Sequence, residues 1–131
     1  MSDGKTALII DDDADIREVL RVMLESGGFQ VDVLSDGIHA VDLQKWYDVI
    51  LLDLKMPVFD GHRLTDYWQL TDPDILRRVI VLSGYSRLAV DQELRTFARL
   101  EKPFDYLTVM KVVGECISQL QPLKSFGGTC V

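Results

Sequence analysis

The chain has 131 residues, of which 47% are hydrophobic and 27% charged, a balance typical of one ordinary globular domain. Its net charge of −7 argues against a broad nucleic-acid surface, because phosphate binding needs clustered Lys and Arg. No apolar run approaches the roughly 20 residues that cross a bilayer, and the N-terminus lacks a signal-peptide pattern. We therefore expect a cytoplasmic protein with no direct contact to nucleic acid or membrane.

Strand and helix patterns alternate along the chain. Apolar or alternating runs predict five strands, at 6–10, 29–34, 49–52, 78–82 and 99–101. Helical spacing predicts five helices, at 14–26, 38–46, 62–70, 88–97 and 106–120. Because parallel strands need helical crossovers, this alternation predicts an α/β fold with a doubly wound, five-stranded parallel sheet. We expect one domain over 5–121, followed by a flexible C-terminal tail or linker stub over 122–131.

Polar residues follow four of the predicted strands directly. They are the DDD run at 11–13, Asp53, Ser83 and Lys102. In doubly wound sheets ligands bind at the carboxyl edge of the strands, so these side chains should converge on one site. Clustered carboxylates repel one another unless a hard cation lies among them, and a set of oxygen ligands suits Mg²⁺. The lysine and the hydroxyl would then bind an anion beside the metal, and an aspartate could attack phosphorus as a nucleophile.

Four motifs, IIDDD, LLDLKMPVFDG, VLSGY and EKPF, occur in this order within residues 5–121. Together they resemble the receiver domain of two-component response regulators. The resemblance implies a flavodoxin-like sheet of strand order 2-1-3-4-5. It also implies Mg²⁺-dependent transfer of a phosphoryl group to this domain from a sensor histidine kinase or a histidine phosphotransfer protein. Such a domain catalyses only its own phosphorylation and dephosphorylation, so we do not expect an ordinary enzyme.

The resemblance assigns a role to each motif residue. Asp53 would be the phospho-acceptor, and the pair Asp11-Asp12 would hold Mg²⁺ together with it. Lys55 would lend its backbone carbonyl to the metal. Ser83 would follow the phosphoryl group with its hydroxyl, and Lys102 would pair with that group as a cation.

Two other interpretations remain open. A haloacid-dehalogenase-like phosphatase also uses a strand-end aspartate, but it needs a second aspartate two residues later, where this chain has Lys55. A pseudo-receiver would bind partners without phosphorylation, but such modules usually lose an acidic or acceptor residue, and here none is missing. We rank both below the phospho-accepting receiver.

Three departures from the family pattern concern how the domain would signal. The interval from Gly37 to Asp53 is about two residues short and that from Ser83 to Lys102 about three short, so the second and fourth helices should be clipped. Arg99 stands where the family usually has Tyr or Phe, and we expect it to stay in water beside Glu101. The domain should then remain a monomer instead of pairing through its fourth helix, fifth strand and fifth helix.

Two residues bear on the lifetime of the phosphorylated form. Lys55 and Tyr85 would flank the path of the hydrolytic water, and neither is placed as an obvious base. We therefore expect slow self-hydrolysis. The clipped helices and the SGY motif slightly favour the receiver of a hybrid sensor histidine kinase over a stand-alone regulator.

Overall fold

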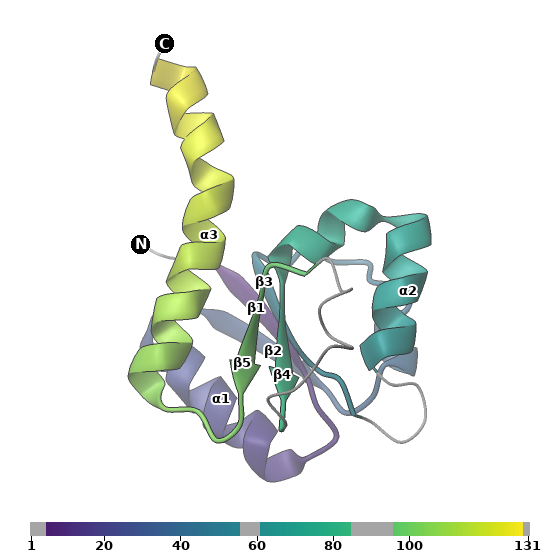
Figure 1. Cartoon of the computed structure of the whole chain (residues 1–131). Coiled ribbons are helices and arrows are strands. Elements are labelled where there is room, and N and C mark those ends of the chain that lie inside the picture. Colours follow the sequence, from purple (N-terminus) through teal and green to yellow (C-terminus); the bar gives the residue numbers. More distant parts are fainter. Residues whose placement is uncertain (1–4, 56–60, 85–95, 130–131) are drawn as a thin grey trace.

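A computed structural model describes residues 5–55, 61–84 and 96–129, with side chains as far as 119. Five strands form one sheet: β1 (Thr6–Ile10), β2 (Gln30–Leu34), β3 (Val49–Asp53), β4 (Val79–Ser83) and β5 (Ala98–Glu101). All neighbours are parallel and the order is β2-β1-β3-β4-β5, which confirms the predicted topology. The strands are drawn side by side in Figure 1. The carboxyl ends of β1, β3, β4 and β5 therefore lie along one edge of the sheet.

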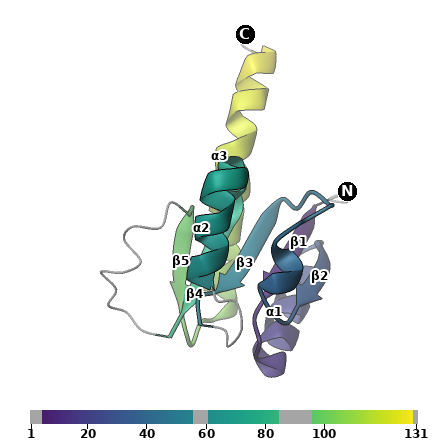
Figure 2. The same ribbon diagram turned by 90° about the vertical axis from the view of Figure 1, so that its right-hand side faces the viewer.

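The described residues contain three α-helices and two short 3₁₀ helices. They are α1 (Ala14–Ser26), η1 (Ile38–Ala40), α2 (Gly61–Thr71), η2 (Pro73–Arg78) and α3 (Tyr106–Thr129). Helices α1 and α3 lie on one face of the sheet and α2 on the other (Figures 1 and 2). Helix α1 begins where the side chain of Asp13 accepts hydrogen bonds from the N–H groups of Asp15 and Ile16, an N-cap arrangement.

The core forms two layers because successive strand residues point to opposite faces. On β1, Ala7 and Ile9 pack with α1 and α3, and Leu8 and Ile10 pack on the α2 side. All five residues of β3 and of β4 are buried, as expected for central strands covered on both faces. This packing fixes the position of the residues at the ends of β3 and β4.

The segment between β2 and β3 corrects one prediction. A helix was expected over 38–46, but only the single turn Ile38–Ala40 forms. After Ala40 the chain runs to Val49 without regular secondary structure. Contacts with a distant residue hold this stretch instead, since Arg78 stacks on Trp46 and donates to the carbonyl of Tyr47. The helix is thus clipped further than the short interval suggested.

Side chains anchor this connector, which we define as residues 41–48, at several points, and Arg78 and Tyr47 make two of these contacts. The guanidinium carbon of buried Arg78 lies 3.6 Å from the centre of the Trp46 ring, and Nε of Arg78 donates to the carbonyl of Tyr47 at 2.9 Å. The hydroxyl of Tyr47 donates to Asp32 on β2 at 2.5 Å. Burial of the hydroxyl is the larger cause, and the Asp32 carboxylate the smaller one, that together raise the pKa of Tyr47 to about 12. Tertiary contacts thus hold in place a segment that has almost no secondary structure.

Two further differences concern the C-terminal third. Helix α3 continues to Thr129, past the predicted end at Leu120, and its last turns project beyond the sheet (Figures 1 and 2). The sequence suggested a stop near Pro122 because proline removes one helical hydrogen bond, but the helix runs through that position. The predicted helix at 88–97 falls mostly outside the described residues, and Thr96 and Phe97 form a bend. Among the described helices, none has the length and apolar character needed to span a membrane.

Candidate functional site

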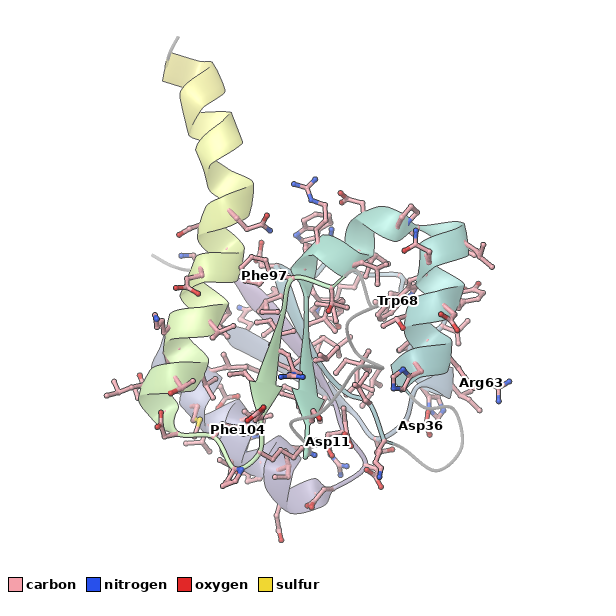
Figure 3. All side chains as sticks on the ribbon, in the orientation of Figure 1. Asp11, Asp36, Arg63, Trp68, Phe97 and Phe104 are labelled. Carbon is pink, nitrogen blue, oxygen red and sulfur yellow. The ribbon has the colours of Figure 1, made fainter. Side chains whose placement is uncertain are left out.

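The carboxyl edge of the sheet brings the predicted site residues together. Asp11 follows β1, Asp53 and Ser83 are the last residues of β3 and β4, and Lys102 follows β5. Asp11 lies at this edge in Figure 3, far from Phe97 at the opposite end of β5. The backbone N–H of Lys102 donates to the carbonyl of Ser83 at 2.7 Å, which ties the fifth strand end to the fourth. Strand ends far apart in the sequence thus form one site, as predicted.

Three carboxylates form the centre of the site. One oxygen atom from each of Asp11, Asp12 and Asp53 lies within 4.8 Å of the others. Asp11 is wholly buried and Asp53 is 4% exposed, while Asp12 is open to solvent. Among the described side chains, Oδ2 of Asp11 is the buried polar atom that makes no hydrogen bond. A buried carboxylate oxygen that makes no hydrogen bond is costly, so this arrangement fits a hard cation with oxygen ligands such as Mg²⁺.

Lys102 supplies a positive charge close to two of the carboxylates. Its Nζ lies 3.4 Å from Oδ2 of Asp11 and 3.5 Å from Oδ1 of Asp53, ion-pair distances to both carboxylates. Burial, and then the charge of Asp11, raise the pKa of Asp53 to about 6, although Lys102 acts in the opposite direction. One lysine therefore does not offset the burial and mutual repulsion of the acidic residues. The site favours a further cation.

The backbone around Asp53 is held closely. Its Oδ1 accepts a hydrogen bond from the N–H of Lys55 at 3.2 Å. Helix α2 starts against the same backbone, because a Cβ atom on Gly61 would lie 2.6 Å from the carbonyl oxygen of Asp53 and 2.7 Å from Cα of Leu54. Only glycine permits this approach. The N-terminus of α2 thus packs directly on the predicted phospho-acceptor.

The remaining predicted residues lie around this centre. Ser83 is buried at the end of β4, and Lys55 is exposed one residue beyond Leu54. Arg99 is exposed on β5, and its Nη2 lies 3.3 Å from Oε2 of Glu101, which confirms the predicted pair. Tyr85 lies outside the described residues.

Sequence reasoning missed Arg17. Its Nη1 donates to the backbone carbonyl of Asp11 at 2.9 Å from the first turns of α1. The available signal was its position: a long cationic side chain one turn into the helix that follows an acidic strand end.

The family model for the response regulator receiver domain matches residues 7–113. This chain is a response regulator receiver domain. Sporulation initiation phosphotransferase F of Bacillus subtilis is 31% identical to this receiver over 123 residues, which cover 90% of this chain and 94% of that protein. The cell cycle transcriptional regulator CtrA of Caulobacter vibrioides is 36% identical over 104 residues, which cover 74% of this chain and 43% of that protein.

Solved structures agree with the receiver fold. The receiver domain of a sensor histidine kinase from Pseudomonas aeruginosa, with a magnesium ion in its active-site cleft, superimposes with a TM-score of 0.77 at 28% identity. That match covers 88% of this receiver and 98% of the other chain. TrrA from Thermotoga maritima, in complex with Mg²⁺ and BeF, gives a TM-score of 0.76 at 25% identity, covering 86% and 98%. Both structures contain magnesium, which in the first lies in the active-site cleft.

Proposed function

We propose that this receiver accepts a phosphoryl group on Asp53 from the phosphohistidine of a sensor histidine kinase or histidine phosphotransfer protein. The observation that carries the proposal is the placement of Asp53 beside Asp11, Asp12 and Lys102 at one sheet edge. A lone strand-end aspartate would be an ordinary solvated residue. Three clustered carboxylates and a lysine that pairs with two of them, with one buried oxygen lacking a hydrogen bond, could hold a cation and an anion together.

The chemistry is a transfer between two nucleophiles. A carboxylate oxygen of Asp53 attacks phosphorus, a P–O bond forms, and the P–N bond to the donor imidazole breaks with its electron pair left on nitrogen. Lys102 is placed to pair with the transferred group, and Ser83 stands at the neighbouring strand end. Mg²⁺ held by Asp11, Asp12 and Asp53, with the carbonyl of Lys55 as a further ligand, would neutralise the charge that gathers on the phosphoryl oxygens.

The haloacid-dehalogenase-like phosphatase and the pseudo-receiver give different outcomes in one experiment. The protein is incubated with Mg²⁺ and acetyl phosphate and its intact mass is measured. A phospho-accepting receiver gains one phosphoryl group, which hydroxylamine removes because the product is an acyl phosphate. A pseudo-receiver gains none. In a parallel incubation with a general phosphomonoester in place of acetyl phosphate, a phosphatase releases many equivalents of phosphate per protein.

Two matched variants each remove one negative charge. Asp53→Asn removes it from the site, and Asp66→Asn removes it from the exposed face of α2. We expect Asp66→Asn to be labelled like the unchanged protein and Asp53→Asn to remain unlabelled. A label that persists on Asp53→Asn would show that the acceptor is another residue.

Passing the phosphoryl group onward is the output that the relatives support best. This receiver spans 94% of a relative named as a phosphotransferase, although it spans less than half of CtrA and other curated relatives. Slow self-hydrolysis would suit such a relay, because the phosphoryl group must survive until the next acceptor arrives. That expectation rests on Lys55 and on Tyr85, the second of which is outside the described residues.

A further inference from the structure

We infer that Arg17 is a positioning residue of the metal site, acting through the peptide that joins Asp11 to Asp12. This inference rests on the proposed function, since it concerns the same acidic pair. The side chain of Arg17 is partly buried, and its Nη1 lies 2.9 Å from the carbonyl oxygen of Asp11. The backbone N–H of Arg17 donates to the carbonyl of Asp13 at 3.0 Å. This second bond is the ordinary first hydrogen bond of α1, so the contact specific to Arg17 is the one made by its side chain.

The remaining contacts of Asp11 show what this hydrogen bond adds. The N–H of Asp11 donates to the carbonyl of Leu34 at 3.1 Å, and Oδ1 accepts from the N–H of Asp13 at 2.9 Å. With Arg17 on the carbonyl, the backbone donor, the backbone acceptor and one carboxylate oxygen are all satisfied. The atom left over is Oδ2, which is buried among Asp53, Asp12 and Lys102. The network thus points a single oxygen of Asp11 at the site.

Arg17 also acts on Asp12. The carbonyl of Asp11 belongs to the planar peptide unit that ends at Cα of Asp12, so fixing that oxygen fixes the direction in which Asp12 leaves the strand. Asp12 is exposed, and no neighbouring side chain in the described part of the structure hydrogen-bonds its carboxylate. Three adjacent aspartates repel one another, and the hydrogen bond from Arg17 restrains the peptide that joins the first two.

Comparing Mg²⁺ binding with Ca²⁺ binding distinguishes a positioning role of Arg17 from a general loss of structure. Mg²⁺ requires nearly octahedral placement of its ligands, whereas Ca²⁺ accepts irregular sets of oxygens. Loss of Arg17 should therefore weaken Mg²⁺ binding more than Ca²⁺ binding. A variant that merely destabilises the fold would weaken both equally.

The test is a titration of the protein with MgCl₂ and with CaCl₂, followed through the amide NMR signals of Asp13 and Lys55, whose N–H groups donate to the site carboxylates. We expect Arg17→Gln to weaken Mg²⁺ affinity about tenfold, the lower end for residues that orient metal ligands, and Ca²⁺ affinity by clearly less. Arg17→Lys, which can still donate one hydrogen bond, should recover part of the Mg²⁺ affinity.

Arg21→Gln is the control. Arg21 lies one turn further along α1 and pairs with Glu18 and Glu25 on the exposed surface, so its loss should leave both affinities unchanged. Equal Mg²⁺ affinity in Arg17→Gln and the unchanged protein overturns the inference, as does an equal loss for both metals. Failure of the unchanged protein to bind Mg²⁺ overturns the proposed function as well, and that result is visible before any variant is made.

Discussion

Asp53 carries a negative charge that its surroundings oppose. It is almost fully buried beside Asp11, and burial and that neighbouring charge raise the pKa of Asp53 from its ordinary value of 3.8 to about 6. Near neutral pH the folded protein without metal must hold this carboxylate ionised at a cost that the unfolded chain does not bear. The residue most important for the proposed chemistry therefore lowers the stability of the metal-free fold.

We predict that Asp53→Asn stabilises the metal-free protein at neutral pH, by about 1–3 kcal/mol for a pKa shift of this size. An acid with a raised folded pKa loses stability as pH rises between its unfolded and folded values, here between 3.8 and about 6. The gain from Asn should therefore be complete above about pH 6 and vanish below about pH 4. Urea unfolding in EDTA across this range measures it.

Asp66→Asn serves again as the control, since it removes an exposed charge of the same kind. Its unfolding free energy should follow that of the unchanged protein at every pH. Identical stabilities for Asp53→Asn and the unchanged protein near pH 8 would show that the burial and repulsion at the site are relieved in some other way.

At the scale of elements, contacts of side chains hold the connector over 41–48, whereas backbone hydrogen bonds within the helices and between the strands hold most of the rest of the fold. Arg78, at the end of η2, is 5% exposed and holds Tyr47 and Trp46, which lie on the other side of β3 in the sequence. Its Nη1 also contacts Asp74 at 3.0 Å. A buried arginine thus anchors the connector on the face of the sheet where a second helix was expected.

We predict that Arg78→Met lowers the unfolding free energy by about 1–3 kcal/mol, because it leaves the carbonyl of Tyr47 without its buried donor and removes the stacking partner of Trp46. Arg77→Met is the matched control. Arg77 is half exposed and pairs with the same Asp74 at 3.5 Å, so its loss should cost well under about 1 kcal/mol. Thermal unfolding followed by circular dichroism compares the two. Equal effects would mean that Arg78 contributes no more than a surface charge.

The same elements show what could be read from the sequence. Strands β3 and β4 were predictable because full burial demands unbroken apolar runs, and the site followed because parallel strands align their carboxyl ends. The connector was not predictable, since its path depends on Arg78, which lies 31 residues from Tyr47. Arg17 was missed for a similar reason: its position after the acidic strand end could be read, but its hydrogen-bond partner, a backbone carbonyl, could not. Local periodicity thus predicted most of the strands and helices, whereas the path of the connector and the contact made by Arg17 depend on residues distant in the sequence or on the backbone.

At the scale of the whole molecule, the face formed by β5 and the N-terminal half of α3 lies at the sheet margin (Figure 1). Arg99 on this face is exposed and paired with Glu101. Burial of an unpaired guanidinium costs several kcal/mol, so this side chain resists leaving water. Movement of this side chain is therefore a poor means of coupling the site to a partner on this face.

We predict that the protein is a monomer both alone and when activated by beryllofluoride and Mg²⁺. Sedimentation velocity on both samples measures this directly. Arg99→Tyr restores the usual residue type, and if the arginine is what prevents pairing, the activated variant should self-associate more than the unchanged protein. An activated dimer of the unchanged protein that is lost on mutating β5 would contradict the prediction.

The two tryptophans lie in different surroundings, so their fluorescence should differ. Trp46 is 58% exposed and lies over the Arg78 cation, whereas Trp68 is 1% exposed and points from α2 toward the sheet (Figure 3). Emission from Trp46 should be red-shifted and open to quenching by iodide, and emission from Trp68 should be blue-shifted and protected. Because one ring reports on the connector and the other on the helix that begins beside Asp53, ligand-induced changes at the two places can be separated by wavelength, without attaching a dye.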